Sequence, residues 1–163
     1  MDLNTWLAQW AHKSQEVQGR VRTARTFLQQ HYPTRPDRIL SEIRCIDFSR
    51  PVSVPSLPVG TQLVGFKDPR VSPYRASYFT RAGIPMERLG VSSSGNLRTS
   101  PKVLPKTLYR YEVLVTVPEG EVLESTCGPA ADMWSIIDRK VLASGGGLQY
   151  LIPNMNRYLR FIA

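Results

Sequence analysis

A glycine-rich stretch near the end of the chain carries side chains suited to a small-molecule site. Residues 144–150 read Ser-Gly-Gly-Gly-Leu-Gln-Tyr, and three consecutive glycines let a backbone approach a ligand closely because no Cβ intervenes. Gln149 adds an amide to this run, while Asp132 and Trp134 supply a carboxylate and an aromatic wall upstream. Polar groups beside bare backbone are more typical of a binding site than of a core strand.

Two further groups of residues fit an anionic ligand. Ser125 and Thr126 place compact hydroxyls at the end of a predicted strand, although the same pair also suits a cap or a turn. Lys67 and Arg70 follow another predicted strand into a proline turn, where such cations pair with a pyrophosphate through charge-assisted hydrogen bonds. The alternative interpretation of Lys67 and Arg70 is two ordinary surface charges.

Tyr78 and Phe79 are the aromatic candidates. Aromatic side chains on a strand usually belong to the core, and an aromatic next to a cationic turn also stacks on a nicotinamide or adenine ring. The sequence leaves both interpretations open.

The elements that must position these groups follow from the hydrophobic pattern. Apolar residues recur at helical spacing over residues 2–31, which predicts one amphipathic helix that Tyr32-Pro33 ends, and a second short helix is predicted at 37–43. We therefore expect a helical segment at 1–36, packed on or leading into a domain at 37–163.

From Phe48 onward, proline, glycine and serine separate short β-type runs. A loop is predicted at 92–106, and strands are predicted at residues 51–54, 61–66, 77–80, 109–117 and 121–124. Helices followed by many short strands predict an α+β fold with an antiparallel or split sheet. Neither a Rossmann fingerprint nor a P-loop is present in the sequence.

Composition narrows the class of partner. The net charge of the 163-residue chain is +8, which favours anionic partners, but its cations are scattered, so we expect no nucleic-acid partner. No apolar run approaches the length of a membrane span, and no Sec-type signal precedes the first helix. Two cysteines, Cys45 and Cys127, and two dispersed histidines form no zinc pattern, and free thiols are expected.

Several of these motifs together resemble the bacterial polymorphic toxin type 46 domain, over residues 38–150. The resemblance is carried by IDFSRPV at 46–52, LPVGT at 57–61, Tyr78-Phe79 with Leu89-Gly90, Ser125-Thr126 with Asp132 and Trp134, and Gly145-Gly146-Gly147 with Gln149-Tyr150. The GGGLQY stretch is also similar to the end of NAD-glycohydrolase toxin domains from mycobacteria and fungi. Glu124 departs from the pattern, because a basic residue is expected before Ser-Thr.

The resemblance implies an ADP-ribosyltransferase-like fold that consumes NAD or NADP as its substrate, with no cofactor and no metal. Gln149 would then orient the nicotinamide ribose and Asp132 would stabilise the developing positive charge. Lys67 and Arg70 would hold the pyrophosphate, with Ser125 and Thr126 beside the substrate and Tyr78, Phe79 or Trp134 over the nicotinamide. Hydrolysis is the expected reaction; ADP-ribose transfer to protein or RNA, a nuclease toxin and a non-enzymatic binding module are the alternatives.

A toxin of this kind implies a cognate immunity protein, which the charge of this chain predicts to be acidic. The N-terminal region is expected to connect to a secretion apparatus or a larger parent toxin. Export by a dedicated machine such as type VI secretion, and action in the cytoplasm of a target bacterium, complete these expectations.

Overall fold

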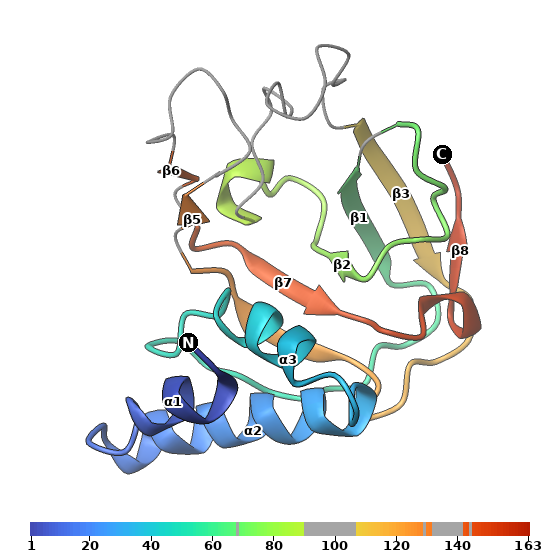
Figure 1. Ribbon diagram of the computed structural model, residues 1–163. Coiled ribbons are helices and arrows are strands. Elements are labelled where there is room, and N and C mark those ends of the chain that lie inside the picture. Colours follow the sequence, from blue (N-terminus) through green and yellow to red (C-terminus); the bar gives the residue numbers. More distant parts are fainter. Residues whose placement is uncertain (68, 90–106, 129, 132–141, 144) are drawn as a thin grey trace.

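The computed structural model describes residues 1–67, 69–89, 107–128, 130–131, 142–143 and 145–163. It is a mixed α+β fold in which helices come first and small antiparallel sheets follow, as the sequence predicted (Figure 1). The first sheet has the order β1-β3-β8, with β1 at Gln62–Lys67, β3 at Thr107–Val113 and β8 at Leu159–Phe161. The second has the order β2-β7-β4, with β2 at Tyr78–Phe79, β7 at Leu148–Leu151 and β4 at Leu123–Thr126.

The N-terminal segment forms two helices, so the prediction of one continuous helix was wrong. Helix α1 spans Leu3–Ala8 and helix α2 spans Gln15–His31. The Asp2 carboxylate accepts a backbone N–H bond of 2.7 Å at the start of α1, and the Ser14 hydroxyl accepts one of 3.2 Å at the start of α2. Because a serine side chain satisfies an otherwise unpaired amide, Ser14 begins a new helix where the apolar pattern alone continues the old one.

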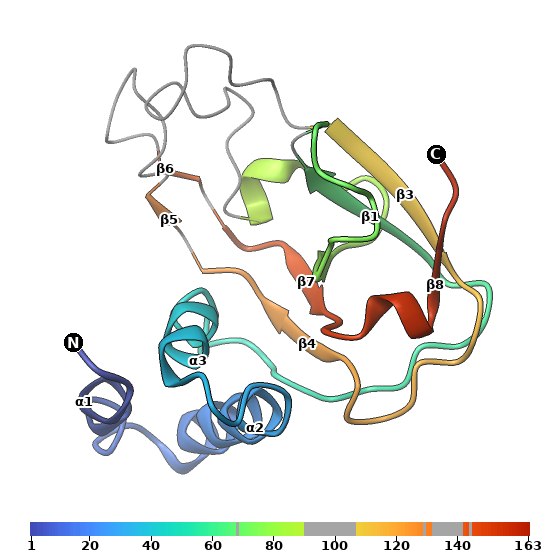
Figure 2. The ribbon, with the colours of Figure 1, turned by 45° about the vertical axis from the view of Figure 1, so that its right-hand side comes forward.

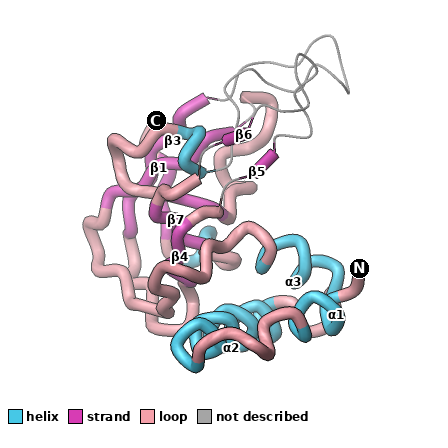
Figure 3. The backbone as a smooth tube through the Cα atoms, turned by 90° about the vertical axis from the view of Figure 1, so that its left-hand side faces the viewer, coloured by secondary structure: helices cyan, strands magenta, loops and turns pink. Residues whose placement is uncertain are grey.

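Helix α3, Pro36–Ile43, confirms the predicted short helix, with proline in its first turn where no N–H partner is needed. The three helices pack on one side of the second sheet, with Leu28, Ile39 and Ile43 buried against Leu123 and Leu151 (Figures 2 and 3). Segments on both sides of residue 36 thus contribute to one core. Among the described residues, no helix combines the length and the apolar character needed to cross a bilayer.

The other side of the second sheet packs against the first sheet. Phe79 and Tyr150 lie with Leu63, Tyr111 and Val113 in a second buried cluster. The rings of Phe79 and Tyr111 meet edge to face with centroids 5.0 Å apart. The second sheet is therefore covered on both sides, by helices on one and by strands on the other.

The predicted strands lie near the observed ones, but their first and last residues differ. β3 ends at Val113 rather than at Val117, because the amides of Leu114 and Val115 both bond to the carbonyl of Tyr158 and leave the ladder. The predicted strand at 51–54 reduces to one bridge, Ser53 to Glu124.

The predicted strand at 121–124 lies two residues later, as β4. Two strands that the sequence did not predict, β7 and β8, complete the sheets, and a short pair joins β5 (Ala130–Ala131) to β6 (Leu142–Ala143). The predicted loop at 92–106 lies outside the described residues.

Candidate active site

The central strand β7 places the glutamine and the tyrosine of the sequence motif on opposite faces of the second sheet. Gln149 pairs with Ser125 across the ladder, and Tyr150 pairs with Glu124. Because successive side chains of a strand alternate, Gln149 faces the helices and Tyr150 faces the first sheet. We call the side of the second sheet that faces the helices the helix face; its residues are Tyr78, Leu123, Ser125, Gln149 and Leu151. We call the opposite side the sheet face; its residues are Arg81, Glu124, Thr126, Leu148 and Tyr150.

On the helix face the structure brings together three of the predicted site residues, Tyr78, Ser125 and Gln149. The Gln149 side chain is 4% exposed and its Nε2 donates to Ser125 Oγ at 3.1 Å. The space that these three side chains line with α2 and α3 is too narrow to admit a water molecule. In this arrangement the Gln149 amide binds another protein group, and the space that it lines with other described residues has no room for water.

Tyr78 belongs to a second hydrogen-bonded group on the helix face. Its hydroxyl donates to the carboxylate of Glu42 on α3, which also accepts from Arg38 Nε at 2.9 Å. Burial raises the pKa of Tyr78 well above its usual value, and the negative charge of Glu42 adds to the effect. Tyr78 is therefore a neutral donor whose proton is held by the protein.

The sheet face carries a different set of groups. Arg81 is exposed, its Nε donates to the Tyr150 hydroxyl at 3.3 Å, and its guanidinium carbon lies 5.3 Å from the centre of the tyrosine ring. Burial raises the pKa of Tyr150; the hydrogen bond from Arg81 opposes this rise, and the negative charge of Glu124 adds to it. A cation, a phenol and a carboxylate thus lie in one row at the edge of a buried core.

The glycine run makes room for protein backbone. A Cβ on Gly147 would lie 2.9 Å from both the Cβ and the carbonyl oxygen of Arg88. The Gly147 amide donates to that carbonyl at 3.0 Å, and the Gly146 amide donates to the Cys127 carbonyl at 2.7 Å. Gly145 and Gly146 have positive φ, which side-chain-bearing residues rarely adopt. The glycines therefore lock the start of β7 to the segments beside it.

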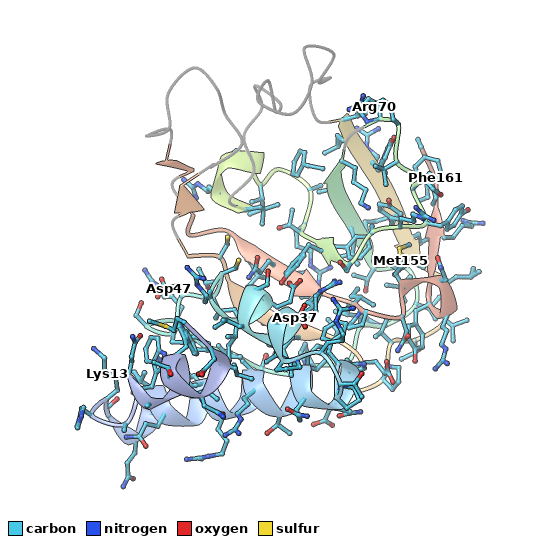
Figure 4. The ribbon with its side chains drawn as sticks, viewed as in Figure 1. Lys13, Asp37, Asp47, Arg70, Met155 and Phe161 are labelled. Atoms are coloured by element: carbon cyan, nitrogen blue, oxygen red, sulfur yellow. The ribbon has the colours of Figure 1, made fainter. Side chains whose placement is uncertain are left out.

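The two predicted cations lie at the far end of the first sheet. Lys67 ends β1 and donates to the carbonyl of Arg75, while Arg70 is exposed in the turn that follows. Asp47, whose amide bonds to the Thr126 carbonyl, marks the end of β4, and Figure 4 shows it well apart from Arg70. The structure does not bring Lys67 and Arg70 to Ser125 and Gln149.

Four predicted site residues remain, of which the structure describes Phe79 and Thr126. Phe79 is buried, in line with the core interpretation of an aromatic strand residue. Thr126 is half-buried on the sheet face beside Leu148. Asp132 and Trp134 lie outside the described residues.

A wider hollow of about 380 Å³ lies at the helical end of the molecule. Trp10, Lys13 and Arg44 line it, together with Phe48 and with Gly128 just beyond β4. Both cysteines are nearby as free thiols, and burial raises the pKa of Cys127 to about 11, so its thiol stays protonated.

Arg81 and Glu124 are the residues that sequence reasoning did not assign. Glu124 and Thr126 alternate in the sequence as residues of one face do, and this signal was available. The pairing of Arg81 with this face depends on the β2–β7 register, which no local pattern in the sequence specifies.

Comparison with known proteins supplies the context for this site. The sequence pattern of the family described as bacterial toxin 46 matches residues 3–158. The chain belongs to this family.

A curated relative of this toxin chain is the NAD(P)(+) glycohydrolase toxin Tse6 of Pseudomonas aeruginosa. The two are 32% identical over 104 residues, which is 64% of this chain and 23% of Tse6, so the chain spans less than a quarter of that relative. The structure of Tse6 in complex with Tsi6 matches with a TM-score of 0.70 and 24% identity, over 92% of this chain and 98% of that one, which shows the same fold. Rhs1-CT in complex with its cognate immunity protein RhsI1 matches at a TM-score of 0.40 and 13% identity, over 69% of this chain and 77% of that one.

Proposed function

We propose that this toxin domain hydrolyses NAD+ or NADP+ at the bond between nicotinamide and ribose. The observation that carries the proposal is the 32% identity to an NAD(P)(+) glycohydrolase toxin over 104 residues. The similarity of fold, which covers 92% of this chain, also supports it. We further propose that the two antiparallel sheets with their helices are an ADP-ribosyltransferase-like core.

The proposed reaction needs little acid catalysis. The bond between C1′ of the ribose and the nicotinamide nitrogen breaks, and its electron pair neutralises the cationic nicotinamide, which leaves without a proton. C1′ develops oxocarbenium character, as in other glycoside hydrolyses, then a water oxygen bonds to C1′ and a proton passes to solvent. The protein must therefore stabilise positive charge at C1′ and hold the dinucleotide.

We propose Asp132 as the carboxylate that stabilises this charge and Trp134 as the aromatic cover of the nicotinamide. Gln149 is the proposed amide that orients the ribose hydroxyls. In the described arrangement that amide donates to Ser125, so this role requires the helix face to open and the substrate to replace the serine as its partner. Tyr78 and Phe79 are both engaged in packing or hydrogen bonding, which leaves Trp134 as the better-suited aromatic.

The decisive experiment mixes the purified domain with NAD+ and, separately, with NADP+, and measures free nicotinamide. Release from either dinucleotide supports the proposal, and a loss of roughly 100-fold or more in Asp132→Asn supports the proposed carboxylate, the scale seen when one charge-stabilising group is removed. Adenine-labelled NAD+ provides the second measurement. Label retained on protein or RNA would instead indicate ADP-ribose transfer, and unchanged NAD+ and NADP+ would contradict both reactions.

We also propose an acidic cognate immunity protein and delivery into a target bacterium as part of a larger toxin. The net charge of +8 supports the first, and the small share of the relative that this chain spans supports the second. Because electrostatic steering acts mainly on association, the on-rate with the immunity protein should fall steeply with salt. An on-rate that does not depend on salt would contradict an electrostatic interface.

A further inference from the structure

We infer that Arg81 is the residue that binds a phosphate of the dinucleotide, that the Tyr150 hydroxyl holds it in place, and that Glu124 positions both. The identity of the ligand rests on the proposed function. The inference differs from the sequence prediction, which gave this role to Lys67 and Arg70.

Arg81 is oriented by the protein and still open to solvent. Extending the pairing of Tyr78 with Leu151 and Phe79 with Tyr150 places Arg81 opposite Leu148, one pleat from Tyr150 on the same face. Its Nε is used by the Tyr150 hydroxyl, whereas its terminal nitrogens have no hydrogen bond or ion pair to any residue the structure describes. A guanidinium fixed at Nε presents these two remaining groups as a fork that matches two phosphate oxygens.

Tyr150 makes this orientation possible because it is itself rigid. Its ring is 2% exposed within the core between the sheets, so its hydroxyl has a fixed position at the edge of that core. The guanidinium carbon of Arg81 also lies over this ring, 5.3 Å from the ring centre, where a cation is attracted to the aromatic face. Arg81 therefore has two contacts to one immobile side chain.

Glu124 completes the row from β4. It lies directly opposite Tyr150 in the ladder, on the same face of the sheet, and its negative charge contributes to the raised pKa of the tyrosine. Because Arg81 Nε donates to the Tyr150 hydroxyl, that hydroxyl keeps its own proton to donate, and Glu124 is the acceptor that we propose for it. Glu124 occupies the position where the type 46 pattern has a basic residue. Its negative charge repels an anion, so a phosphate would bind nearer to Arg81 than to Glu124. Glu124 thus acts through Tyr150 as a positioning residue.

Two other cationic regions compete for the same role. Lys67 is bound to the Arg75 carbonyl at the end of β1, with Arg70 in the next turn. The hollow at the helical end contains Lys13 and Arg44. Arg81 differs in being held by a buried aromatic side chain through both a hydrogen bond and a ring contact, and the two other regions supply rival variants for the test.

The first experiment measures binding of ADP-ribose, a hydrolysis-resistant diphosphate probe, by calorimetry to wild type, Arg81→Gln, Arg44→Gln, Arg70→Gln and Arg110→Gln. Arg110 is an exposed arginine on β3 and serves as the control for lost charge. Arg81→Gln should bind roughly 10- to 100-fold more weakly, because two charge-assisted hydrogen bonds are lost, and the other variants should bind as wild type does. Equal binding by Arg81→Gln and wild type, or a loss confined to Arg44→Gln or Arg70→Gln, would overturn the inference.

The second experiment tests the row itself. Tyr150→Phe keeps the ring and removes only the hydroxyl, so we expect roughly 3- to 10-fold weaker ADP-ribose binding. In the double variant with Arg81→Gln, the loss should not exceed that of Arg81→Gln alone. Glu124→Ala should weaken binding like Tyr150→Phe, and Glu124→Gln, whose amide oxygen still accepts, should recover most of it, with Glu119→Ala as the exposed control. Additive losses would show that these residues act separately and that Glu124 does not position Arg81.

A comparison of substrates separates this inference from the proposed function. NAD+ contains phosphates and nicotinamide riboside contains none, so Arg81→Gln should raise KM for NAD+ and leave nicotinamide release from the riboside unchanged. Equal losses on both substrates would contradict phosphate binding at Arg81. If wild type releases no nicotinamide from any of them, the proposed function fails, and the ADP-ribose measurements still decide the role of Arg81. Absence of ADP-ribose binding by wild type would overturn the inference whatever the activity.

Discussion

The two faces of the β2-β7-β4 sheet differ in what their polar groups bind. On the helix face Gln149 donates to Ser125, and Tyr78 donates to Glu42, so protein groups satisfy one another in a space too narrow for water. On the sheet face Arg81 uses Nε to bind Tyr150, and its two terminal nitrogens bond to no residue that the structure describes. One face is packed against the helices, and the other ends in an exposed arginine that a buried tyrosine orients.

This difference shows that a polar residue in a motif is not enough to locate a site. Gln149 and Tyr150 are adjacent in the same strand, yet the pleat sends one amide into the helical core and one hydroxyl toward an exposed arginine. A one-residue shift in register would exchange the two environments. The predictions below test whether the helix face is mainly structural and the sheet face mainly functional.

The largest expected difference is in core packing, compared through two leucines of β7. Leu151 is 3% exposed against the helices, so Leu151→Ala should lower the free energy of unfolding by about 2–5 kcal/mol. Leu148 is only half-buried on the sheet face, and Leu148→Ala should cost about 1 kcal/mol. Urea unfolding followed by circular dichroism measures both. Equal losses would mean that the two faces are packed alike.

The hydrogen bond between Gln149 and Ser125 gives the next largest effect. Gln149→Leu leaves the Ser125 hydroxyl buried without a partner, and Ser125→Ala leaves the Gln149 amide unpaired, so each should cost about 1–3 kcal/mol. The double variant replaces both polar groups and should be more stable than the sum of the single losses predicts.

Activity of the folded double variant then distinguishes the roles of Gln149. Lost nicotinamide release would support the proposed contact with the ribose, because the strands are still held together. Full activity would restrict Gln149 to joining β7 and β4. A strictly additive cycle would instead contradict the hydrogen bond itself.

The sequence predicted the fold class and most elements because these depend on local patterns. The apolar periodicity of α2 and the proline at the start of α3 are local signals, and the structure confirms them. The break before α2 was missed because a serine inside an apolar repeat looks the same whether or not its side chain caps a new helix. β7 was missed because its residues follow three glycines, which are typical of a loop; here Gly147 admits the Arg88 backbone beside the strand.

The candidate site was predictable only as a list of residues. The pairing of Ser125 with Gln149 and the placement of Arg81 beside Tyr150 depend on register between strands that are distant in sequence. Lys67 and Arg70 were predicted to bind the pyrophosphate because they follow a strand. Only the sheet topology shows that this strand, β1, belongs to the first sheet and not to the sheet that contains Ser125 and Gln149. The sequence predicted which kinds of side chain the site contains. It did not predict on which face of the sheet each side chain lies.

Alkaline pH should separate the two faces through their tyrosines. The folded pKa of Tyr78 lies well above that of the unfolded chain, which is near 10, because burial and Glu42 disfavour the phenolate. Below about pH 10 both states keep this proton and stability is unaffected; above it, the unfolded state loses the proton first, so the free energy of unfolding falls by about 1.4 kcal/mol per pH unit until the folded pKa is passed. Tyr78→Phe should remove that slope.

Tyr150→Phe provides the comparison, because the Arg81 hydrogen bond opposes the rise in the Tyr150 pKa. The slope that Tyr150 contributes should therefore end at a lower pH than the slope that Tyr78 contributes. Urea unfolding at pH steps from about 9 to about 11.5 measures both contributions. Identical pH profiles for wild type and Tyr78→Phe would show that the Tyr78 hydroxyl is not held by Glu42.

The smallest expected effect on stability belongs to Thr126, the half-buried threonine of the sheet face. Its side chain makes no hydrogen bond to any residue the structure describes, so Thr126→Val should change the free energy of unfolding by less than about 0.5 kcal/mol. If the dinucleotide lies on this face, replacing the hydroxyl by a methyl should still weaken ADP-ribose binding by roughly 2- to 10-fold, the value of one hydrogen bond. A variant that is as stable as wild type and binds ADP-ribose equally well would place the substrate away from Thr126, and with it away from this end of the sheet face.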